Sequence, residues 1–396
     1  MAFANSTYFT TNPATPYEPF KPISEIRSMF SPDAKLLIAI GGWGDTQGLS
    51  LGATNKTTQE LYARNVAEML KTHGFDGVDI DWEYPGGNGQ DYRQAPNEEK
   101  SAEIETYPQL LAAIRAAIGK EKLLSIAVPG REVDMIAYNR EQSPKIWPSV
   151  DFVNVMTYDL MNRRDKVTMH HTDVAGSLKT IEKYICLGLA PEKINLGFAF
   201  YAKWFTTDPN SNCAEKPLGC DVVPLENKDG SDNGKSGVIT FEKRFMNKPK
   251  ANLTESPDAS CGEAAGFRCP AGHCCSADGY CGDTEAHCGM NCMSGYGECR
   301  VNITAVDSWR TALEKGQADT EAGGQYYWDS AANLFWTWDT PEHMEQKFEK
   351  IVKAKGLGGI MAWSLGEDSF DWSHLATMQK MHGQLQEKPS TCAAKV

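Results

Sequence analysis

The sequence predicts an α/β protein of the (β/α)8-barrel type, and three observations support this fold class. Short apolar runs alternate along the chain with stretches of helical periodicity, and most of these runs are flanked by Gly or Pro. Repeated strand–helix units imply parallel strands with right-handed crossovers. One strand also ends in a cluster of acids, and barrels of this type hold functional side chains at the carboxyl ends of their strands.

Each expected element has local support in the sequence. Most apolar runs are rich in β-branched or aromatic residues, as expected for strands that are covered on both faces. In the first long helix, Leu61, Val66, Met69 and Leu70 form one apolar stripe. The expected strands are 36–40, 77–81, 123–128, 152–156, 194–200 and 359–363, and the expected helices are 58–73, 103–118, 176–187, 341–355 and roughly 373–385.

The alternation of strands and helices stops after Tyr201 and resumes at the strand 359–363. The intervening sequence is first polar and turn-rich, then dense in cysteine, and then aromatic and strand-like. We therefore expect an insertion in the loop after one barrel strand, with a disulfide module inside it. The predicted parts are a catalytic barrel at 1–205 and 341–388, an insertion subdomain at 206–260 and 300–340, and a module at 261–299.

The most informative segment runs from residue 77 to residue 83 and is expected to be one strand. Because side chains alternate along a strand, Asp79, Asp81 and Glu83 share one face while three apolar residues share the other. Crowded carboxylates cannot all ionise cheaply, so at least one pKa should rise and protons should be shared. A surface strand or a calcium loop explains this pattern poorly, since the opposite face is apolar and the spacing is strand-like.

Composition excludes several kinds of partner. A net charge of −13 argues against nucleic acid and anionic membrane surfaces, and no apolar stretch is long enough to span a bilayer. Eight of the 12 cysteines lie between Cys261 and Cys299, which indicates a disulfide scaffold in an oxidising compartment. Glycosylation tripeptides also fit a secreted, extracellular protein; they begin at Asn5, Asn55, Asn252 and Asn302.

The acid segment resembles a known family. Asp76, Asp79, Asp81 and Glu83 match the DxxDxDxE signature of glycoside hydrolase family 18, the chitinases, in its fungal type. The resemblance implies hydrolysis of β-1,4 bonds in chitin with retention of configuration, assisted by the acetamide of the substrate, and no cofactor or metal. It implies Glu83 as general acid/base and Asp81 as the partner of the acetamide, sharing a proton with Asp79. Asp76 lies an odd number of residues from the other three acids, so on a strand its side chain points to the opposite face, and its role is expected to be structural.

Other motifs at strand ends match the same family in the same order. The resemblance implies that Tyr158 hydrogen-bonds the acetamide carbonyl and that Trp363 is the floor beneath the reacting sugar. Further expected substrate contacts are Met156, Asp159, Tyr84, Trp43 and Tyr201. Trp43 either lines the cleft or caps the barrel. Ala39 stands where the family often has a serine that supports the acid cluster, as in related fungal sequences, so we do not read this as loss of activity.

The cysteine cluster resembles a hevein-like chitin-binding module, and the adjacent Cys274 and Cys275 fit it better than a zinc site. The resemblance implies the pairs Cys261–Cys275, Cys269–Cys281, Cys274–Cys288 and Cys292–Cys299. Ser276 and Tyr280 match its sugar-binding positions, whereas Asp278 and His287 replace two aromatic residues, so binding is expected to be weak. Of the remaining cysteines, Cys213 and Cys220 can close a small loop, Cys186 is expected to be a buried thiol and Cys392 a free tail cysteine.

Two questions remain open at the level of sequence. Residues 1–5 have no secretory-leader pattern, and by the family match the chain starts near the end of the second barrel strand. We therefore expect an N-terminally incomplete barrel that lacks its first strand. The expected function is a monomeric chitinase acting on chitin or chitooligosaccharides. The alternatives are a chitinase-like lectin that binds without cutting, and an endo-β-N-acetylglucosaminidase acting on N-glycans.

Overall fold

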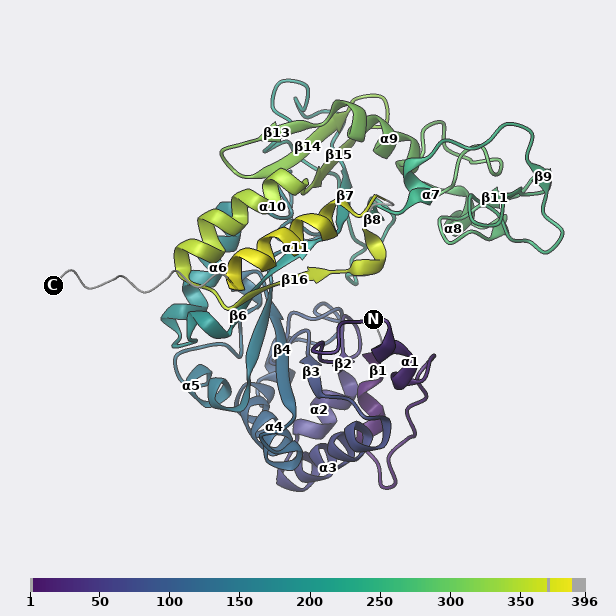
Figure 1. Ribbon diagram of the computed structural model, residues 1–396. Coiled ribbons are helices and arrows are strands. Elements are labelled where there is room, and N and C mark those ends of the chain that lie inside the picture. Colours follow the sequence, from purple (N-terminus) through teal and green to yellow (C-terminus); the bar gives the residue numbers. More distant parts are fainter. Residues whose placement is uncertain (1–2, 369–370, 387–396) are drawn as a thin grey trace.

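A computed structural model describes residues 3–368 and 371–386, and it has the predicted α/β barrel-type architecture (Figure 1). Its main sheet contains seven parallel strands in chain order with the last strand at one edge. These are β1 (Phe3–Ala4), β2 (Leu37–Gly41), β3 (Gly77–Asp81), β4 (Leu123–Pro129), β5 (Phe152–Met156), β6 (Ile194–Ala199) and β16 (Gly359–Trp363). Among the described residues β16 and β1 are not paired, so the sheet stays open along this seam.

Helices connect the parallel strands and cover the outside of the sheet (Figure 1). They are α1 (Ile23–Ser28), α2 (Gln47–Ala53), α3 (Lys56–His73), α4 (Glu103–Ile118), α5 (Ser143–Ile146), α6 (Val174–Cys186), α10 (Pro341–Lys347) and α11 (Ser373–Gln386). Short 3-10 turns are η1 (Ser6–Phe9), η2 (Asn97–Lys100), η3 (Glu132–Asp134), η4 (Trp147–Ser149), η5 (Pro191–Lys193) and η7 (Leu365–Glu367).

Local sequence explains where the longest helix begins and ends. Asn55 and Thr58 form a reciprocal capping box at the start of α3, and Gly74 ends it in the left-handed conformation that glycine adopts without strain. The predicted helix 341–355 is divided, because α10 ends at Lys347 and a π-helical segment, η6 (Phe348–Lys353), continues it. Within the described residues no helix is long and apolar enough to cross a membrane.

The insertion forms a second, antiparallel sheet beside the barrel (Figure 1). Its strand order is β13 (Gln317–Asp319), β14 (Gly324–Asp329), β15 (Leu334–Trp338), β7 (Tyr201–Thr206) and β8 (Ser236–Thr240). Helices α7 (Lys243–Met246) and α9 (Ala305–Lys315) belong to the same part of the chain. Strand β7 starts directly after β6, so the chain passes from one sheet into the other almost without a loop.

The cysteine-rich module projects from the insertion to one side of the molecule (Figure 1). It has little regular structure: β9 (Thr254–Glu255), β10 (Phe267–Arg268), β11 (Cys274–Cys275), β12 (Cys281–Gly282) and α8 (Glu285–Cys288). All four disulfides implied by the resemblance are present, and so is Cys213–Cys220. Its buried cysteines Cys261, Cys269 and Cys275 belong to the same apolar cluster as Phe245 and Trp309, so this part of the module shares a core with the insertion.

One expectation about cysteine is wrong. Cys186 was expected to be a buried thiol, but it is exposed, because it is the last residue of α6 and its side chain lies on the solvent side of that helix. The neighbouring Leu187 is buried in its place. Cys392 lies outside the described residues.

Candidate active site

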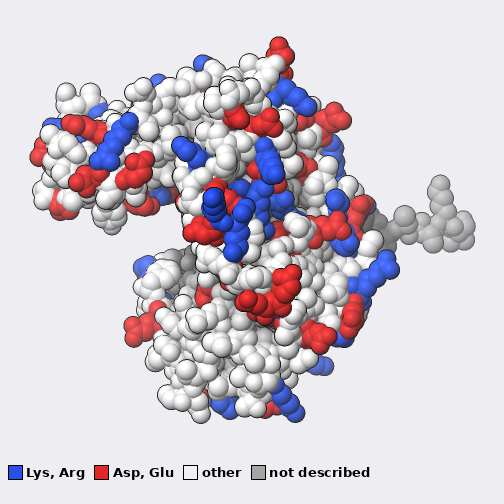
Figure 2. All heavy atoms as spheres, turned by 180° about the vertical axis from the view of Figure 1, so that it is seen from behind, with Lys and Arg blue, Asp and Glu red and all other residues white. Residues whose placement is uncertain are grey.

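A cavity of about 680 Å³ opens at the carboxyl ends of the parallel strands and extends between the barrel and the insertion. Every residue expected in the catalytic site and the sugar site lines it, from Trp43 in the loop after β2 to Trp363 at the end of β16. On the face seen in Figure 2, Lys and Arg side chains gather among acidic ones where the two halves of the molecule meet. The barrel therefore supplies one wall of the cavity and the insertion the other.

The predicted alternation of the acid segment is present. Asp79, Asp81 and Glu83 face the cavity, whereas Val78 and Ile80 are fully buried in the barrel core. The strand itself ends at Asp81, two residues earlier than expected, so Glu83 lies in the following loop. Asp76 is held outside the site, since its carboxylate accepts from Arg27 at 2.9 Å and from the Leu36 amide at 2.8 Å. This fits a structural role for Asp76.

Burial changes the pKa values of Asp79 and Asp81, the two acids within strand β3. Burial raises the pKa of Asp79, although hydrogen bonds from Ser125 and Asn154 to its carboxylate partly oppose this. For Asp81, burial and the negative charges of Glu83 and Asp79 together raise the pKa well above its usual value. One oxygen of Asp81 is buried without a hydrogen-bond partner in the protein. A protonated Asp81 between two other carboxyl groups therefore has the lowest electrostatic cost.

Glu83 has the ionisation expected of a proton donor. Burial is the main reason that its pKa rises to about 7, with a smaller contribution from the charges of Asp159 and Asp134 and an opposing hydrogen bond from Tyr84. A carboxyl group with a pKa near 7 holds its proton near neutral pH and can also release it. The cavity thus contains one carboxyl group suited to both acid and base steps.

Asp159 is the charged member of the site. Burial alone would raise its pKa, but Lys203 and His171 outweigh burial and hold the pKa of Asp159 well below its usual range. Its carboxylate accepts from the Tyr201 hydroxyl at 2.9 Å and from Lys203 Nζ at 3.0 Å. His171 is fully buried behind it, 3.8 Å from the carboxylate. Asp159 therefore stays ionised beside acids whose pKa values are raised.

Aromatic and sulfur-containing side chains form the apolar part of the cavity. Tyr158, Met156 and Trp363 belong to one small cluster at the strand ends, and the Tyr158 hydroxyl lies 3.8 Å from the sulfur of Met361. Trp43 is 47% exposed and its ring lies edge-on to Tyr84, with centroids 6.4 Å apart. Of the two positions considered for Trp43, the structure has it in the cavity wall.

Four polar residues of the site were not anticipated from the sequence. Ser125 and Asn154 hold Asp79, while Lys203 and His171 hold Asp159. Ser125 and Asn154 could have been found from the sequence, because each is the single polar residue of an otherwise apolar strand, β4 and β5 respectively. Ala39, which is paired with Asp79 in the parallel register, cannot donate to that carboxylate, and Ser125 from the other neighbouring strand does so instead.

Comparison with known proteins agrees with this geometry. The family model for glycosyl hydrolases of family 18 matches residues 1–368. The chain belongs to glycosyl hydrolase family 18. The family match spans both the parallel strands and the insertion, so the cavity of this family 18 chain is enclosed entirely by matched sequence.

Individual relatives are more distant. Chitinase A1 of Niallia circulans is 31% identical over 196 residues, and chitotriosidase-1 of Mus musculus is 28% identical over 195 residues. These matches cover 44% and 46% of this chain but only 27% and 41% of the relatives, so the chain spans less than half of either protein. A chitinase structure from Rhizomucor miehei has a TM-score of 0.64 at 17% identity, covering 96% of this chain and 93% of that chain. It supports the family 18 fold.

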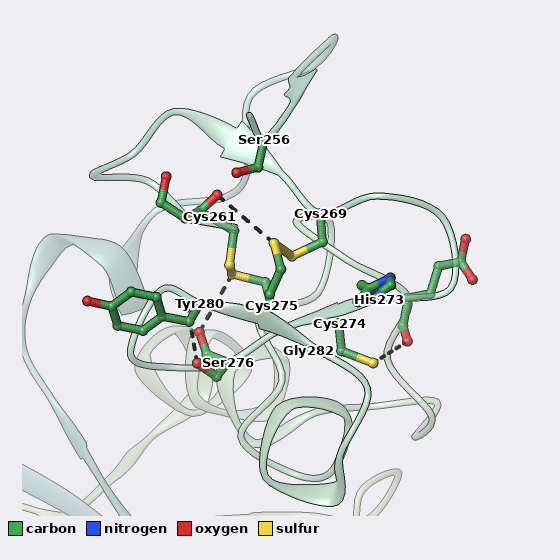
Figure 3. Close-up of a disulfide and its surroundings, with 12 residues drawn as sticks. Ser256, Cys261, Cys269, His273, Cys274, Cys275, Ser276, Tyr280 and Gly282 are labelled. Carbon is green, nitrogen blue, oxygen red and sulfur yellow. Dashed lines mark hydrogen bonds between the residues drawn. A yellow bond between two sulfur atoms is a disulfide. The ribbon is translucent and has the colours of Figure 1, made fainter. Parts of the chain in front are cut away.

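The expected sugar-binding residues of the module do not line the family 18 cavity, and they differ in exposure. Tyr280 is 62% exposed and its ring points away from the disulfides, whereas Ser276 is buried at its base (Figure 3). The Ser276 hydroxyl accepts from the Tyr280 amide at 3.3 Å, which ties the two residues together. Asp278 is exposed beside them, and His287 is bonded to Thr284 at 2.8 Å. Tyr280 is thus the one open aromatic ring among the three positions.

Proposed function

We propose that the protein is a chitinase that hydrolyses β-1,4-N-acetylglucosamine linkages with retention of configuration, assisted by the substrate acetamide. The observation that carries the proposal is the raised pKa of Glu83, about 7, inside a cavity whose other carboxyl groups are neutral or engaged. Asp81 favours its protonated form, Asp79 accepts from Ser125 and Asn154, and Asp159 accepts from Lys203 and Tyr201. Membership of family 18 supports the substrate-assisted route, in which the acetamide oxygen of the sugar is the nucleophile.

The proposed reaction uses Glu83 twice. Its carboxyl group donates a proton to the glycosidic oxygen as the C1–O bond breaks, while the acetamide carbonyl oxygen attacks C1 and forms an oxazolinium ion. Water then attacks C1 from the side of the departed group and gives a proton back to Glu83. Two displacements restore the original configuration.

Neighbouring residues orient the acetamide group in this scheme. Asp81 accepts a hydrogen bond from the acetamide N–H and shares its proton with Asp79 as positive charge develops on the ring. The Tyr158 hydroxyl donates to the acetamide oxygen, and burial keeps this hydroxyl protonated by raising its pKa well above the usual value. Trp363 supplies an apolar surface beneath the pyranose.

Related structures support the substrate class. The Cycas revoluta plant class V chitinase was solved as a mutant in complex with (GlcNAc)3, and the Ostrinia furnacalis Group II chitinase domain as a mutant with a chitin oligosaccharide. Five disulfides and the exposed asparagines of the four glycosylation tripeptides favour secretion to an oxidising extracellular space. We also propose that Ser276 and Tyr280 bind chitin weakly, and that the enzyme acts as a monomer, since one chain encloses the cavity.

Hydrolysis of short fluorogenic chitooligosaccharides by the wild type and by Glu83→Gln tests the proposal. We expect label release by the wild type only, and proton NMR of the first product should show the β-anomer. Equal release by both variants would exclude Glu83 as the acid. Binding of chitooligosaccharides without release by either variant would favour the lectin, and cleavage of N-glycans alone would favour an endo-N-acetylglucosaminidase.

A further inference from the structure

Two loops, one from the barrel and one from the insertion, contact each other at the edge of the cavity. The first, residues 88–94, follows β3 in the barrel, and the second, residues 226–232, connects β7 to β8 in the insertion. Tyr92, Glu226, Gly230 and Asp232 all line the cavity, so the junction of the loops faces the substrate space. We call these two loops together the strap.

The centre of the strap is a buried carboxylate with two donors from the opposite loop. The Tyr92 hydroxyl donates to Glu226 Oε1 at 2.5 Å, and the Arg93 guanidinium donates to the same oxygen. The Glu226 side chain is only 8% exposed and its bond to Tyr92 is partly buried, whereas Arg93 is 44% exposed and approaches the same oxygen from the solvent side. Such bonds resist separation better than exposed ion pairs do.

Close packing and a second ion pair reinforce the junction. A Cβ atom added at Gly230 would lie 3.3 Å from the Tyr92 ring and 3.4 Å from Arg93, so the backbone of one loop rests directly on the other. Arg163, in the loop between β5 and α6, pairs with Asp232 at 3.3 Å. Glu226 and Asp232 are themselves bridged across the base of the second loop, which holds both acids in place.

The barrel side of the strap is also firmly supported. The Arg164 guanidinium lies 4.4 Å from the centre of the Tyr92 ring, donates to Asp134 at 3.0 Å and donates to the Asn88 carbonyl at 2.7 Å. Tyr92 is therefore held from below by Arg164 and from the side by Glu226. Two walls connected in this way cannot part without breaking several charged contacts at once.

We propose that the strap is a specificity element that makes the enzyme attack chitin from chain ends. This inference rests on the proposed function, because it concerns how a polysaccharide reaches Glu83. A long chain cannot be laid sideways into a cavity whose two walls are joined to each other, so it enters by one end. The Tyr92–Glu226 and Arg163–Asp232 contacts determine this mode of entry and take no part in the chemistry.

The test compares the wild type with Glu226→Ala/Asp232→Ala, which removes the acceptors of the strap from one side. Both enzymes act on a long, soluble chitin derivative while reducing ends and viscosity are followed together. The wild type should release reducing ends with little loss of viscosity, and the double variant should lose several-fold more viscosity per reducing end. Asp91→Asn breaks the Lys100–Asp91 pair at 2.5 Å between the first loop and η2, and it should behave like the wild type.

A binding experiment tests entry without catalysis. In the Glu83→Gln background, a chitin oligosaccharide blocked at both ends by a protein-sized group should bind at least tenfold more weakly than the free oligosaccharide. Opening the strap should abolish this difference. Equal binding of free and blocked oligosaccharides with the strap intact overturns the inference, and so do equal viscosity ratios in two active enzymes. If the wild type neither cleaves nor binds free chitooligosaccharides, the proposed function fails instead.

Discussion

The barrel cavity and the cysteine-rich module present sugar-binding candidates in opposite physical settings. In the cavity, Asp81 is buried and Glu83 is half-buried, and removal from water is the largest cause of their raised pKa values. In the module, Tyr280 is 62% exposed on a scaffold held by four disulfides. Chemistry that needs a shifted pKa requires a thick core and exclusion of water, whereas simple stacking on a sugar needs only one rigid, exposed ring.

The largest expected effect concerns the acids of the barrel cavity. Asp81→Asn removes the carboxyl group that can pass its proton to Asp79, and kcat on chitooligosaccharides should fall by about 100-fold or more. Steady-state kinetics measure this change. Asp76→Asn is the matched control from the same segment: it loses the Arg27 contact and should lower stability while leaving kcat unchanged below the unfolding temperature. A normal kcat for Asp81→Asn would remove Asp81 from the mechanism.

The second prediction concerns pH and stability. Because the folded state raises the pKa of Glu83 from 4.5 to about 7, protonated Glu83 favours folding below pH 4.5, and this contribution is lost as pH rises to about 7. The loss is on the order of 3 kcal/mol. Urea unfolding at several pH values should therefore show Glu83→Gln gaining stability relative to the wild type across this range. Parallel pH curves for the two proteins would contradict the raised pKa.

The raised pKa of Glu83 also predicts how activity changes with pH. The proton donor must be protonated in the free enzyme, so kcat/KM should decline as pH rises above about 7. A pH–rate profile on a short soluble oligosaccharide measures this limb. A basic limb that starts only several pH units higher would place the essential acid elsewhere.

The disulfides test how far the module depends on covalent bonds. Replacing Cys269 and Cys281 by serine should destabilise the module by about 2–4 kcal/mol, because little regular structure compensates for the lost crosslink. Hydrolysis of short oligosaccharides should persist, since the barrel acids contact none of these sulfurs. Hydrogen exchange resolves the two regions. Because the module shares a buried cluster with the insertion around Trp309, amide protection there should fall as well.

The smallest expected effect concerns the exposed ring of Tyr280 in the cysteine-rich module. Tyr280→Ala should weaken binding to insoluble chitin by a few-fold, because one exposed ring contributes about 1 kcal/mol. Hydrolysis of soluble oligosaccharides should stay unchanged. Phe20→Ala, at another exposed aromatic ring that does not line the cavity, is a control for nonspecific loss of surface. Equal loss of binding in both variants would show that Tyr280 makes no specific contact with chitin, and it would favour a role for the module as a spacer.

Expectations drawn from the sequence were confirmed where a few neighbouring residues are enough to predict the feature. The alternation of acids with Val78 and Ile80 is a property of one strand, and it located both the cavity face and the core face. The disulfide pairs were implied by resemblance over a 39-residue stretch and are present. Local patterns failed for Cys186, because the last turn of a helix offers little periodicity from which to judge burial.

Sequence by itself determined the order of strands and helices, the family, and which acids share a face, since these follow from alternation and from motifs of a few residues. Tertiary structure alone decided the partners of those acids. Ser125 lies 46 positions from Asp79, and Lys203 lies 44 from Asp159. The strap joins residues 134 positions apart in sequence. Such contacts, and the pKa shifts caused by burial, exist only once the barrel and the insertion are packed together and water is excluded between them.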